Sequence, residues 1–103
     1  MLKPPLPPKP LSESIIQSKV IKAFEKEGWF VVKIIQTTKN GWPDLQCHRN
    51  KITVFIECKE ENKLCKDQLQ LYRHKQLREQ GFTVFVINHL NRIENALKES
   101  NLL

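Results

Sequence analysis

Residues 41–59 read GWPDLQCHRNKITVFIECK, and this stretch decides the fold. Residues 52–56 form a run of apolar and β-branched residues that is typical of a buried strand. The run continues directly into Glu57 and Lys59, and Asp44 follows Pro43 at the other end of the stretch. Because a buried charge is costly unless it is paired or bound to a metal, we expect these three charged side chains to have a chemical function.

The turn at Asn50 and Lys51 determines whether the two acids meet. A two-residue loop would join residues 44–48 to residues 52–58 as an antiparallel hairpin, and Asn tolerates the positive φ of such a turn. Asp44 then lies opposite Glu57, with Cβ atoms about 5 Å apart on one face. Lys59 points the same way, since side chains alternate along a strand. A loop one residue longer, without a bulge, would put the acids on opposite faces.

On the N-terminal side, the sequence predicts a helix and a strand. Residues 13–27 carry apolar residues at helical spacing, with Ser12 as N-cap, Glu13 in the first turn and Gly28 as the stop. Residues 29–35 are rich in aromatic and β-branched residues and predict the first strand.

On the C-terminal side, residues 66–80 predict a second helix, residues 82–87 a strand covered on both faces, and the last residues a short third helix. Asn91 is the expected cap of that third helix. The expected buried faces are Leu69, Tyr72, Gln76 and Leu77 for the second helix, and Leu90, Ile93 and Leu97 for the third.

The predicted order α-β-β-β-α-β-α describes an α/β fold with a mixed sheet flanked by helices. With 103 residues, the chain is long enough for one compact domain, which we place at residues 12–103. Residues 1–11 contain five of the six prolines and are expected to form a separate proline-rich arm.

The amino-acid composition indicates which kinds of partner the chain suits. The chain has 17 Lys and Arg against 11 Asp and Glu, a net charge of +6 that suits nucleic acid. No apolar run is long enough for a membrane span or a signal peptide, so we expect a soluble intracellular protein with no membrane partner. The three cysteines match no disulfide framework. A metal site built from Cys47, His48, Cys58 and Cys65 is an alternative, although the spacing fits no common zinc pattern.

The facing acids point to a particular chemistry. Two carboxylates a few ångströms apart repel, and a divalent cation supplies the missing counter-charge. Oxygen ligands favour Mg²⁺, with Mn²⁺ as a substitute, over zinc. Lys59 beside such an ion could position a water and neutralise charge on a phosphate. Together these groups predict metal-assisted phosphodiester hydrolysis.

These residues also resemble a known family. Residues 41–45, GWPDL, followed by Glu57-Cys58-Lys59, are similar to the PD-(D/E)xK nuclease signature, and specifically to its virus-type replication-repair nuclease branch, the VRR-NUC domain. Glu13 matches the helical glutamate of that branch, and Gln70 matches its helical glutamine, with Gln68 as the alternative. The resemblance covers about residues 12–87 and implies a restriction-endonuclease-like fold.

The resemblance implies a set of roles. Asp44, Glu57, Lys59 and Gln70 would be catalytic, and Glu13, Asp44, Glu57 and the backbone carbonyl of Cys58 would bind the metal. The implied activity is Mg²⁺-dependent cleavage of DNA, with branched DNA such as Holliday junctions as substrate. It further implies a homodimer, a phage origin with action in the host cytoplasm, and no small-molecule cofactor.

Several basic side chains are candidates for contacts with phosphate. With one small domain, shape and backbone contacts should dominate recognition of DNA. The candidates are Lys33, Lys39, Arg49, Lys63, Lys66, Arg73, His74 and Lys75. Two other functions stay open at this point: a non-catalytic nucleic-acid-binding or assembly subunit that retains the nuclease fold, and a nuclease directed at RNA.

Overall fold

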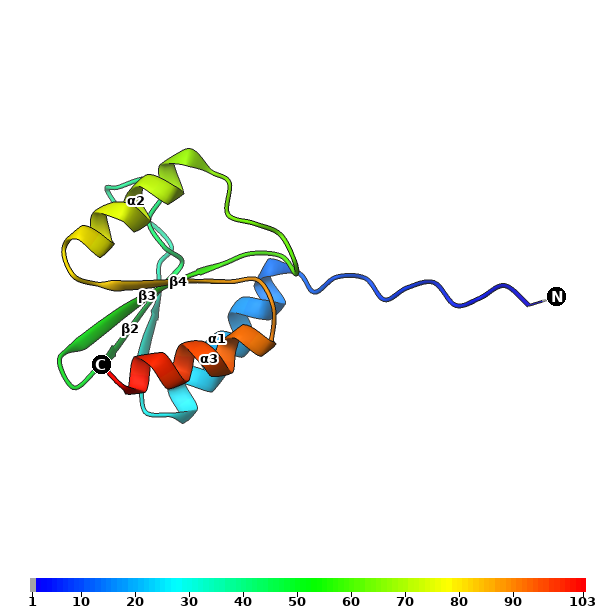
Figure 1. Ribbon diagram of the computed structural model, residues 1–103, viewed down its shortest axis with the longest axis horizontal. Coiled ribbons are helices and arrows are strands. Elements are labelled where there is room, and N and C mark those ends of the chain that lie inside the picture. Colours follow the sequence, from blue (N-terminus) through cyan, green and yellow to red (C-terminus); the bar gives the residue numbers. More distant parts are fainter. Residues whose placement is uncertain (1) are drawn as a thin grey trace.

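The order of elements follows the prediction. The computed structural model describes residues 2–103 and contains three helices and four strands (Figure 1). In chain order they are α1 (Glu13–Lys26), β1 (Phe30–Lys33), β2 (Leu45–Arg49), β3 (Ile52–Cys58), α2 (Gln68–Glu79), β4 (Thr83–Ile87) and α3 (Asn91–Asn101). The α/β fold with the order α-β-β-β-α-β-α is therefore confirmed.

The four strands form one mixed sheet in the spatial order β1-β2-β3-β4. Strands β1, β2 and β3 are antiparallel neighbours, whereas β3 and β4 are parallel and are joined by the α2 crossover. Helices α1 and α3 lie on one side of the sheet and α2 lies on the other (Figure 1). Residues at the ends of β2 and β3 can therefore be approached from α1 on one side and from α2 on the other.

The hairpin has the predicted register. Asn50 and Lys51 both have positive φ, 50° and 68°, which is the geometry of a two-residue hairpin turn. Arg49 pairs with Ile52, and Leu45 pairs with Ile56. One step further along the same ladder, Asp44 faces Glu57.

Alternation along the strands divides the core into two clusters. Val54, Ile56 and Cys58 of β3 pack on the side covered by α1 and α3, where Phe24 is among their buried neighbours. Phe55 faces the other side and packs with Leu77 of α2, Val84 and Trp42. Glu57 alternates with Ile56 and Cys58, so its side chain lies on the α2 side together with Phe55.

The ends of α1 agree with the sequence, whereas β1 is shorter than predicted. Ser12 Oγ accepts the backbone N–H of Ile15 at 3.3 Å, and Gly28 ends the helix with φ +86°. β1 does not reach residue 35, because the chain turns away after Ile34. Trp29, predicted to begin the strand, is instead a core residue whose indole N–H donates to Asn101 Oδ1 at 3.1 Å.

The predicted buried face of α2 is wrong. Leu69, Tyr72 and Gln76 are exposed, and of the expected face only Leu77 is buried. The buried positions are His74 and Leu77, with Gln70 partly buried on the same side. The helix also begins at Gln68, two residues later than predicted, because the Asp67 carboxylate caps it by accepting the Gln70 N–H at 2.9 Å.

The predicted cap of α3 is also wrong. Asn91 is the first residue of the helix, and its backbone N–H donates to the ring Nδ1 of His89 at 3.3 Å. Leu90 occupies the cap position and is 37% exposed, so it does not belong to the buried stripe. Ile93 and Leu97 do pack on the core, where Ala96 joins them.

The N-terminal arm lies outside this layered structure. Residues 2–10 are exposed and have no helix or strand, and they run away from the domain (Figure 1). Leu11 is held at the base of the arm by two hydrogen bonds with Glu61, from Leu11 N to Glu61 Oε1 at 3.4 Å and from Glu61 N to Leu11 O at 3.0 Å. Within residues 2–103, no helix is both long and apolar enough to span a bilayer.

Candidate active site

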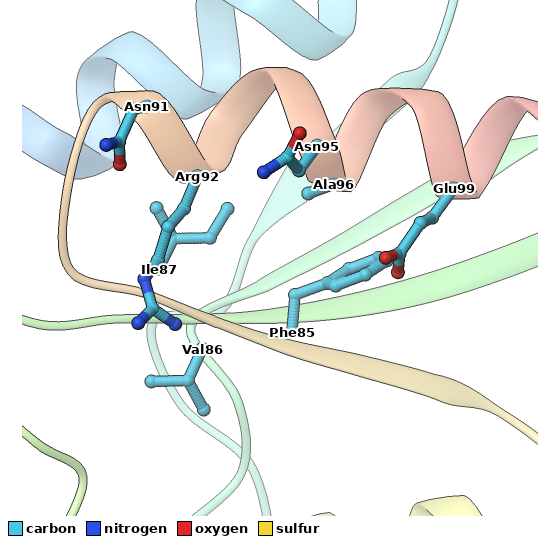
Figure 2. Close-up of a pocket in the computed structure, with 8 residues that line it drawn as sticks. All are labelled: Phe85, Val86, Ile87, Asn91, Arg92, Asn95, Ala96 and Glu99. Carbon is cyan, nitrogen blue, oxygen red and sulfur yellow. The ribbon is translucent and has the colours of Figure 1, made fainter.

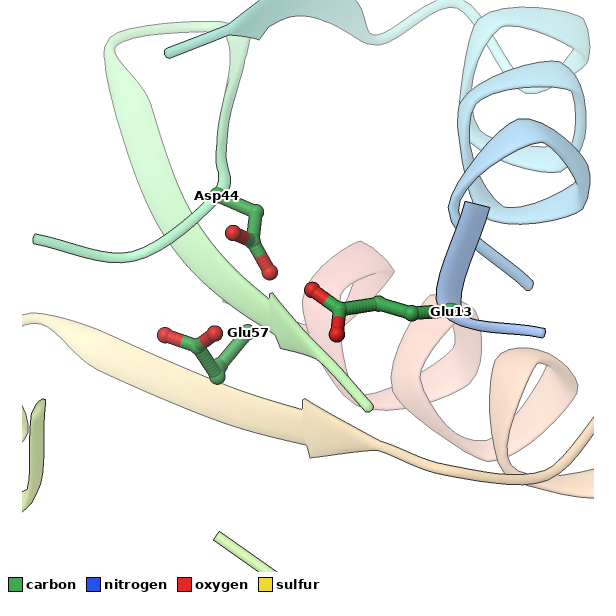
Figure 3. Close-up of side chains that lie close together, drawn as sticks. All are labelled: Glu13, Asp44 and Glu57. Carbon is green, nitrogen blue, oxygen red and sulfur yellow. The ribbon is translucent and has the colours of Figure 1, made fainter. Parts of the chain in front are cut away.

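Three carboxylates from different parts of the chain meet at one end of the β2–β3 hairpin. Glu13 comes from the first turn of α1, Asp44 from the bend before β2, and Glu57 from β3 (Figure 3). One oxygen of each lies within 4.8 Å of the others. Among residues 2–103, this acid cluster is the one group of three or more acidic, His or Cys side chains close enough to share a metal ion.

Backbone hydrogen bonds hold Asp44 between the strands. Its Oδ2 accepts the backbone N–H of Cys58 at 2.7 Å, and its carbonyl oxygen accepts the N–H of Ile34 at 2.8 Å. The side chain is thereby fixed to the end of β3, while the backbone is fixed to the end of β1. The peptide of Cys58, whose carbonyl is an expected metal ligand, is thus anchored beside the acid cluster.

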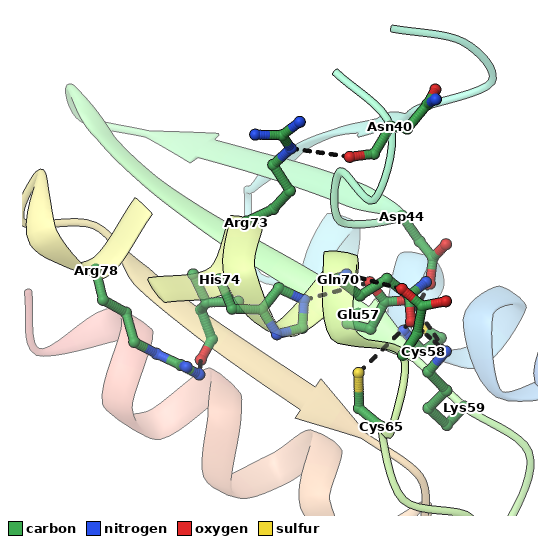
Figure 4. Close-up of polar contacts among 12 residues, drawn as sticks. Asn40, Asp44, Glu57, Cys58, Lys59, Cys65, Gln70, Arg73, His74 and Arg78 are labelled. Atoms are coloured by element: carbon green, nitrogen blue, oxygen red, sulfur yellow. Dashed lines mark hydrogen bonds and ion pairs between the residues drawn. The ribbon is translucent and has the colours of Figure 1, made fainter. Parts of the chain in front are cut away.

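Glu57 is completely buried, and both of its oxygens face donors. Its Oε2 accepts from Gln70 Nε2 at 3.3 Å and lies 3.8 Å from Lys59 Nζ, while Oε1 lies 3.4 Å from His74 Nε2 (Figure 4). Burial raises the pKa of Glu57 from 4.5 to about 7. The Asp44 charge adds to this rise in pKa, whereas the His74 hydrogen bond and the Lys59 charge oppose it.

Lys59 and Gln70 lie together beside Glu57. Lys59 Nζ donates to Gln70 Oε1 at 2.7 Å, and the Lys59 side chain keeps 18% exposure, so it is within reach of solvent. The Asp67 cap begins α2 so that Gln70 falls in its first turn, facing the sheet. Gln70 is therefore the helical glutamine that touches both Glu57 and Lys59, while Gln68 is exposed.

The donor set fits a hard divalent cation. Asp44 and Glu57 are too close to remain charged together without a counter-ion, and Glu13 adds a third oxygen from the opposite side. A set made only of carboxylates suits Mg²⁺ or Mn²⁺ rather than zinc. Lys59 offers a positive charge to the acid cluster, and it approaches from the Glu57 side.

Sequence reasoning gave one residue that touches the site the wrong role and did not identify another. His74 was expected to contact phosphate, but it is completely buried against Glu57, so that expectation is wrong. Cys65 Sγ lies 3.5 Å from Gln70 Oε1. The spacing of His74, four residues after Gln70, could have indicated that both side chains face the same partner.

The other basic candidates occupy different regions. Lys39 is exposed on the loop between β1 and β2, and Lys63 and Lys66 are exposed on the loop between β3 and α2. Arg73 has a structural contact, since its Nε donates to the carbonyl of Asn40 at 2.8 Å. Arg49 lies at the opposite end of β2 from Asp44, where it donates to the Glu27 carbonyl at 2.9 Å and stacks on Trp29.

The cysteines behave as core residues. Cys47 and Cys58 are buried, and burial raises the pKa of both thiols, that of Cys47 to about 12. Burial also raises the pKa of Cys65. Protonated thiols are poor metal ligands, and these cysteines belong to no candidate metal cluster among residues 2–103. The alternative metal site at Cys47, His48, Cys58 and Cys65 is therefore not supported.

A separate cavity lies between β4 and α3. It has a volume of about 460 Å³ and is lined by residues that include Phe85, Arg92 and Glu99 (Figure 2). None of the catalytic or metal-binding residues expected from the sequence lines it, and its one acidic residue is Glu99. The chemistry of the chain is therefore concentrated at the acid cluster and not in this cavity.

Comparison with known proteins connects this geometry to a family. The chain superposes on a solved structure of a VRR-NUC domain with a TM-score of 0.78 and 26% sequence identity, over 85% of this chain and 96% of that one. The chain folds as a VRR-NUC domain. No family model matches the sequence, and no curated protein matches it. The VRR-NUC assignment thus rests on the three-dimensional match, and it confirms the resemblance seen in residues 41–59.

The VRR-NUC match extends from the hairpin to the whole fold. The three helices and the four-stranded mixed sheet of this chain match the VRR-NUC fold, and the superposition covers 85% of this chain. A nuclease fold of this kind indicates nuclease activity in general terms, use of a divalent metal and binding of nucleic acid.

Proposed function

We propose that this chain is a Mg²⁺-dependent endonuclease that hydrolyses phosphodiester bonds in branched DNA, such as Holliday junctions. The observation that carries the proposal is the acid cluster of Glu13, Asp44 and Glu57 with Lys59 Nζ 3.8 Å from Glu57. A protein that only bound DNA would gain nothing from three carboxylates at this position, because they would repel the phosphates.

Each residue of the proposed site has a distinct task. Glu13, Asp44, Glu57 and the Cys58 carbonyl would hold Mg²⁺ or Mn²⁺. Such a cation, when bound, polarises a phosphoryl oxygen and lowers the pKa of a bound water. Lys59 positions the attacking water and offsets negative charge on the phosphate. Gln70 holds the Lys59 ammonium in place through its side-chain oxygen.

The size and charge of the chain support a substrate recognised by shape. A domain of 103 residues with a net charge of +6 has little surface for reading bases, so contacts with phosphates dominate. We propose Lys39, Lys63 and Lys66 for those contacts, since they are exposed on loops beside α2. Arg73 contributes through the part of its guanidinium that neither Asn40 nor Gln76 engages, and Arg49, at the other end of β2, would contact phosphates farther from the acid cluster. Action on DNA puts the working location inside a cell.

Cleavage assays with matched variants test the proposal. Labelled four-way junction, flap and linear duplex DNA are incubated with Mg²⁺, with Mn²⁺ and with chelator, and an RNA duplex is run in parallel. Asp44→Asn and Lys59→Ala should each lower cleavage of the junction by at least about 100-fold while DNA binding survives. Glu94→Gln, an exposed acid on α3, is the matched control and should cleave like the wild type.

The outcomes separate the open functions. Cleavage that persists in both Asp44→Asn and Lys59→Ala would contradict the assignment of the acid cluster as the active site. Binding of every DNA without cleavage in any metal would favour the non-catalytic subunit, and preferential cleavage of the RNA would change the substrate class.

We also propose that two copies of the chain act together, because a four-way junction offers two strands to be cut. Light scattering should give the mass of a dimer, alone or on junction DNA. A monomer under both conditions would rule out paired cutting by a stable dimer.

A further inference from the structure

His74 of α2 is buried in an unusual way. The side chain is buried, with 1% exposure, and its Nε2 lies 3.4 Å from Glu57 Oε1 (Figure 4). The other ring nitrogen, Nδ1, is also buried and has no hydrogen-bond partner among residues 2–103. One ring nitrogen thus faces the acid cluster, while the other has no hydrogen bond within residues 2–103.

Packing alone does not account for a histidine at this position. A buried nitrogen without a partner destabilises the folded state, and an apolar side chain of similar size would avoid that cost. Leu77, on the same buried face of α2, belongs to the apolar cluster with Phe55 and Val84. A leucine in place of His74 would extend this cluster, so the imidazole is retained against the preference of its surroundings.

The contact between His74 and Glu57 explains why a histidine occupies this position. Gln70 and Lys59 both approach Oε2, whereas His74 is the hydrogen-bond partner found at Oε1 within residues 2–103. With donors on both oxygens, the plane of the carboxylate is fixed. With His74 removed, Glu57 would be held from one side only and could rotate about its last side-chain bond. At 3.4 Å the contact is longer than most N–H···O hydrogen bonds, so its main effect is on direction rather than on energy.

We propose that His74 is a positioning residue that orients the Glu57 carboxylate toward the divalent cation. This inference rests on the proposed function, since it assumes that Glu57 is a metal ligand. His74 touches neither the metal nor the DNA in this role, because it lies behind Glu57 in the interior. Donors that hold a metal-binding carboxylate from behind commonly change metal affinity by about 10- to 100-fold.

Binding of Mn²⁺ in the absence of DNA tests this role. The full chain is titrated with Mn²⁺ and followed by electron paramagnetic resonance. His74→Leu should bind Mn²⁺ at least about 10-fold more weakly than the wild type. His74→Gln, whose Nε2 can still donate to Glu57, should bind within about threefold of the wild type. Thermal unfolding without metal should show His74→Leu melting at the same temperature as the wild type or higher.

Controls separate this inference from the proposed function. Leu77→Met repacks the same face of α2 without touching Glu57 and should bind Mn²⁺ normally. Equal Mn²⁺ affinity in His74→Leu and the wild type would overturn the inference while leaving the metal site intact, and so would failure of His74→Gln to rescue binding. If the wild type binds no better than Asp44→Asn, the metal site itself is absent and the proposed function fails. His74→Met replaces His74→Leu, with the same expectations, if the leucine variant does not fold.

Discussion

Burial of Glu57 opposes the negative charge that its proposed function as a metal ligand requires. Its carboxylate is buried beside Asp44, which raises its pKa to about 7, yet a metal ligand must be charged. Gln70, Lys59 and His74 reduce this conflict because each presents a donor to the carboxylate. A bound cation would remove it, so metal binding and ionisation of Glu57 should be linked.

Without divalent cations, Glu57 should make the free energy of unfolding fall as the pH rises. The folded state holds the proton up to a pH of about 7, whereas the unfolded chain releases it near 4.5. The Glu57 contribution is therefore fully present below the lower value and lost as the pH rises through the upper one. At most it amounts to about 3 kcal/mol. Urea unfolding with chelator across this pH range measures the slope.

The Glu57→Gln variant is the control for this slope. It cannot ionise at this position, so its stability should vary less with pH than that of the wild type over the same range. A wild-type profile parallel to that of the variant would contradict the linkage.

At single residues, the sequence predicted which charged side chains lie together better than it predicted the residues that pack against them. Asp44, Glu57 and Lys59 stand out because charge interrupts apolar strand residues, and the two-residue turn determines which of them face each other. His74, one turn after Gln70, was expected to reach the phosphate, but it is buried. Its burial depends on the packing of α2 over Glu57, which no local pattern contains.

Among the elements, the β2–β3 hairpin fixes the site most directly. Lys51 adopts φ 68°, a left-handed conformation that L residues other than Asn and Asp rarely take. Lys51→Gly should therefore raise the free energy of unfolding by about 0.5–1 kcal/mol, because glycine removes the steric strain. Chemical denaturation checks this, with Lys63→Gly in an exposed loop as the control that should gain nothing.

Adding a residue to the same turn should have the opposite effect on function. One glycine inserted between Asn50 and Lys51 changes the register, unless a bulge absorbs it, and moves Asp44 away from Glu57. Binding of Mn²⁺ should then fall by at least about 100-fold while much of the fold remains. Retained Mn²⁺ affinity, with cooperative unfolding, would show that the register does not set the site.

The helices show where reasoning from the sequence ends. β3 was predicted with its observed bounds, since the apolar and β-branched run of residues 52–56 continues directly into Glu57 and Cys58. The face of α2 was wrong because two polar residues, Gln70 and His74, point inward to Glu57 and turn Leu69 and Tyr72 outward. The spacing of apolar residues predicts which face of a helix packs against a hydrophobic core. This prediction fails where the helix covers a polar site.

In the whole molecule, the sheet brings distant parts of the chain together at one end of the β2–β3 hairpin, while the N-terminal arm lies outside the folded domain. Residues 2–10 are exposed, so removal of residues 1–10 should leave the melting temperature within about 2 °C of the full chain. Affinity for DNA should weaken slightly, since Lys3 and Lys9 are lost. Calorimetry and binding at several salt concentrations measure the two effects.

Removal of residues 1–12 is the matching comparison. It deletes the Ser12 cap and the Leu11 hydrogen bonds to Glu61, and it should lower stability by about 1–2 kcal/mol. Equal stability of the two truncated forms would contradict an anchoring role for Leu11 and Ser12.

The anchoring of Leu11 also has a mechanical consequence. Glu13 follows two residues later, so a force on the arm would otherwise act on the first turn of α1 and displace a carboxylate of the acid cluster. The paired hydrogen bonds between Leu11 and Glu61 transfer that load to the loop after β3. We therefore expect Glu13 to keep its position when a tag or another molecule is attached to the arm.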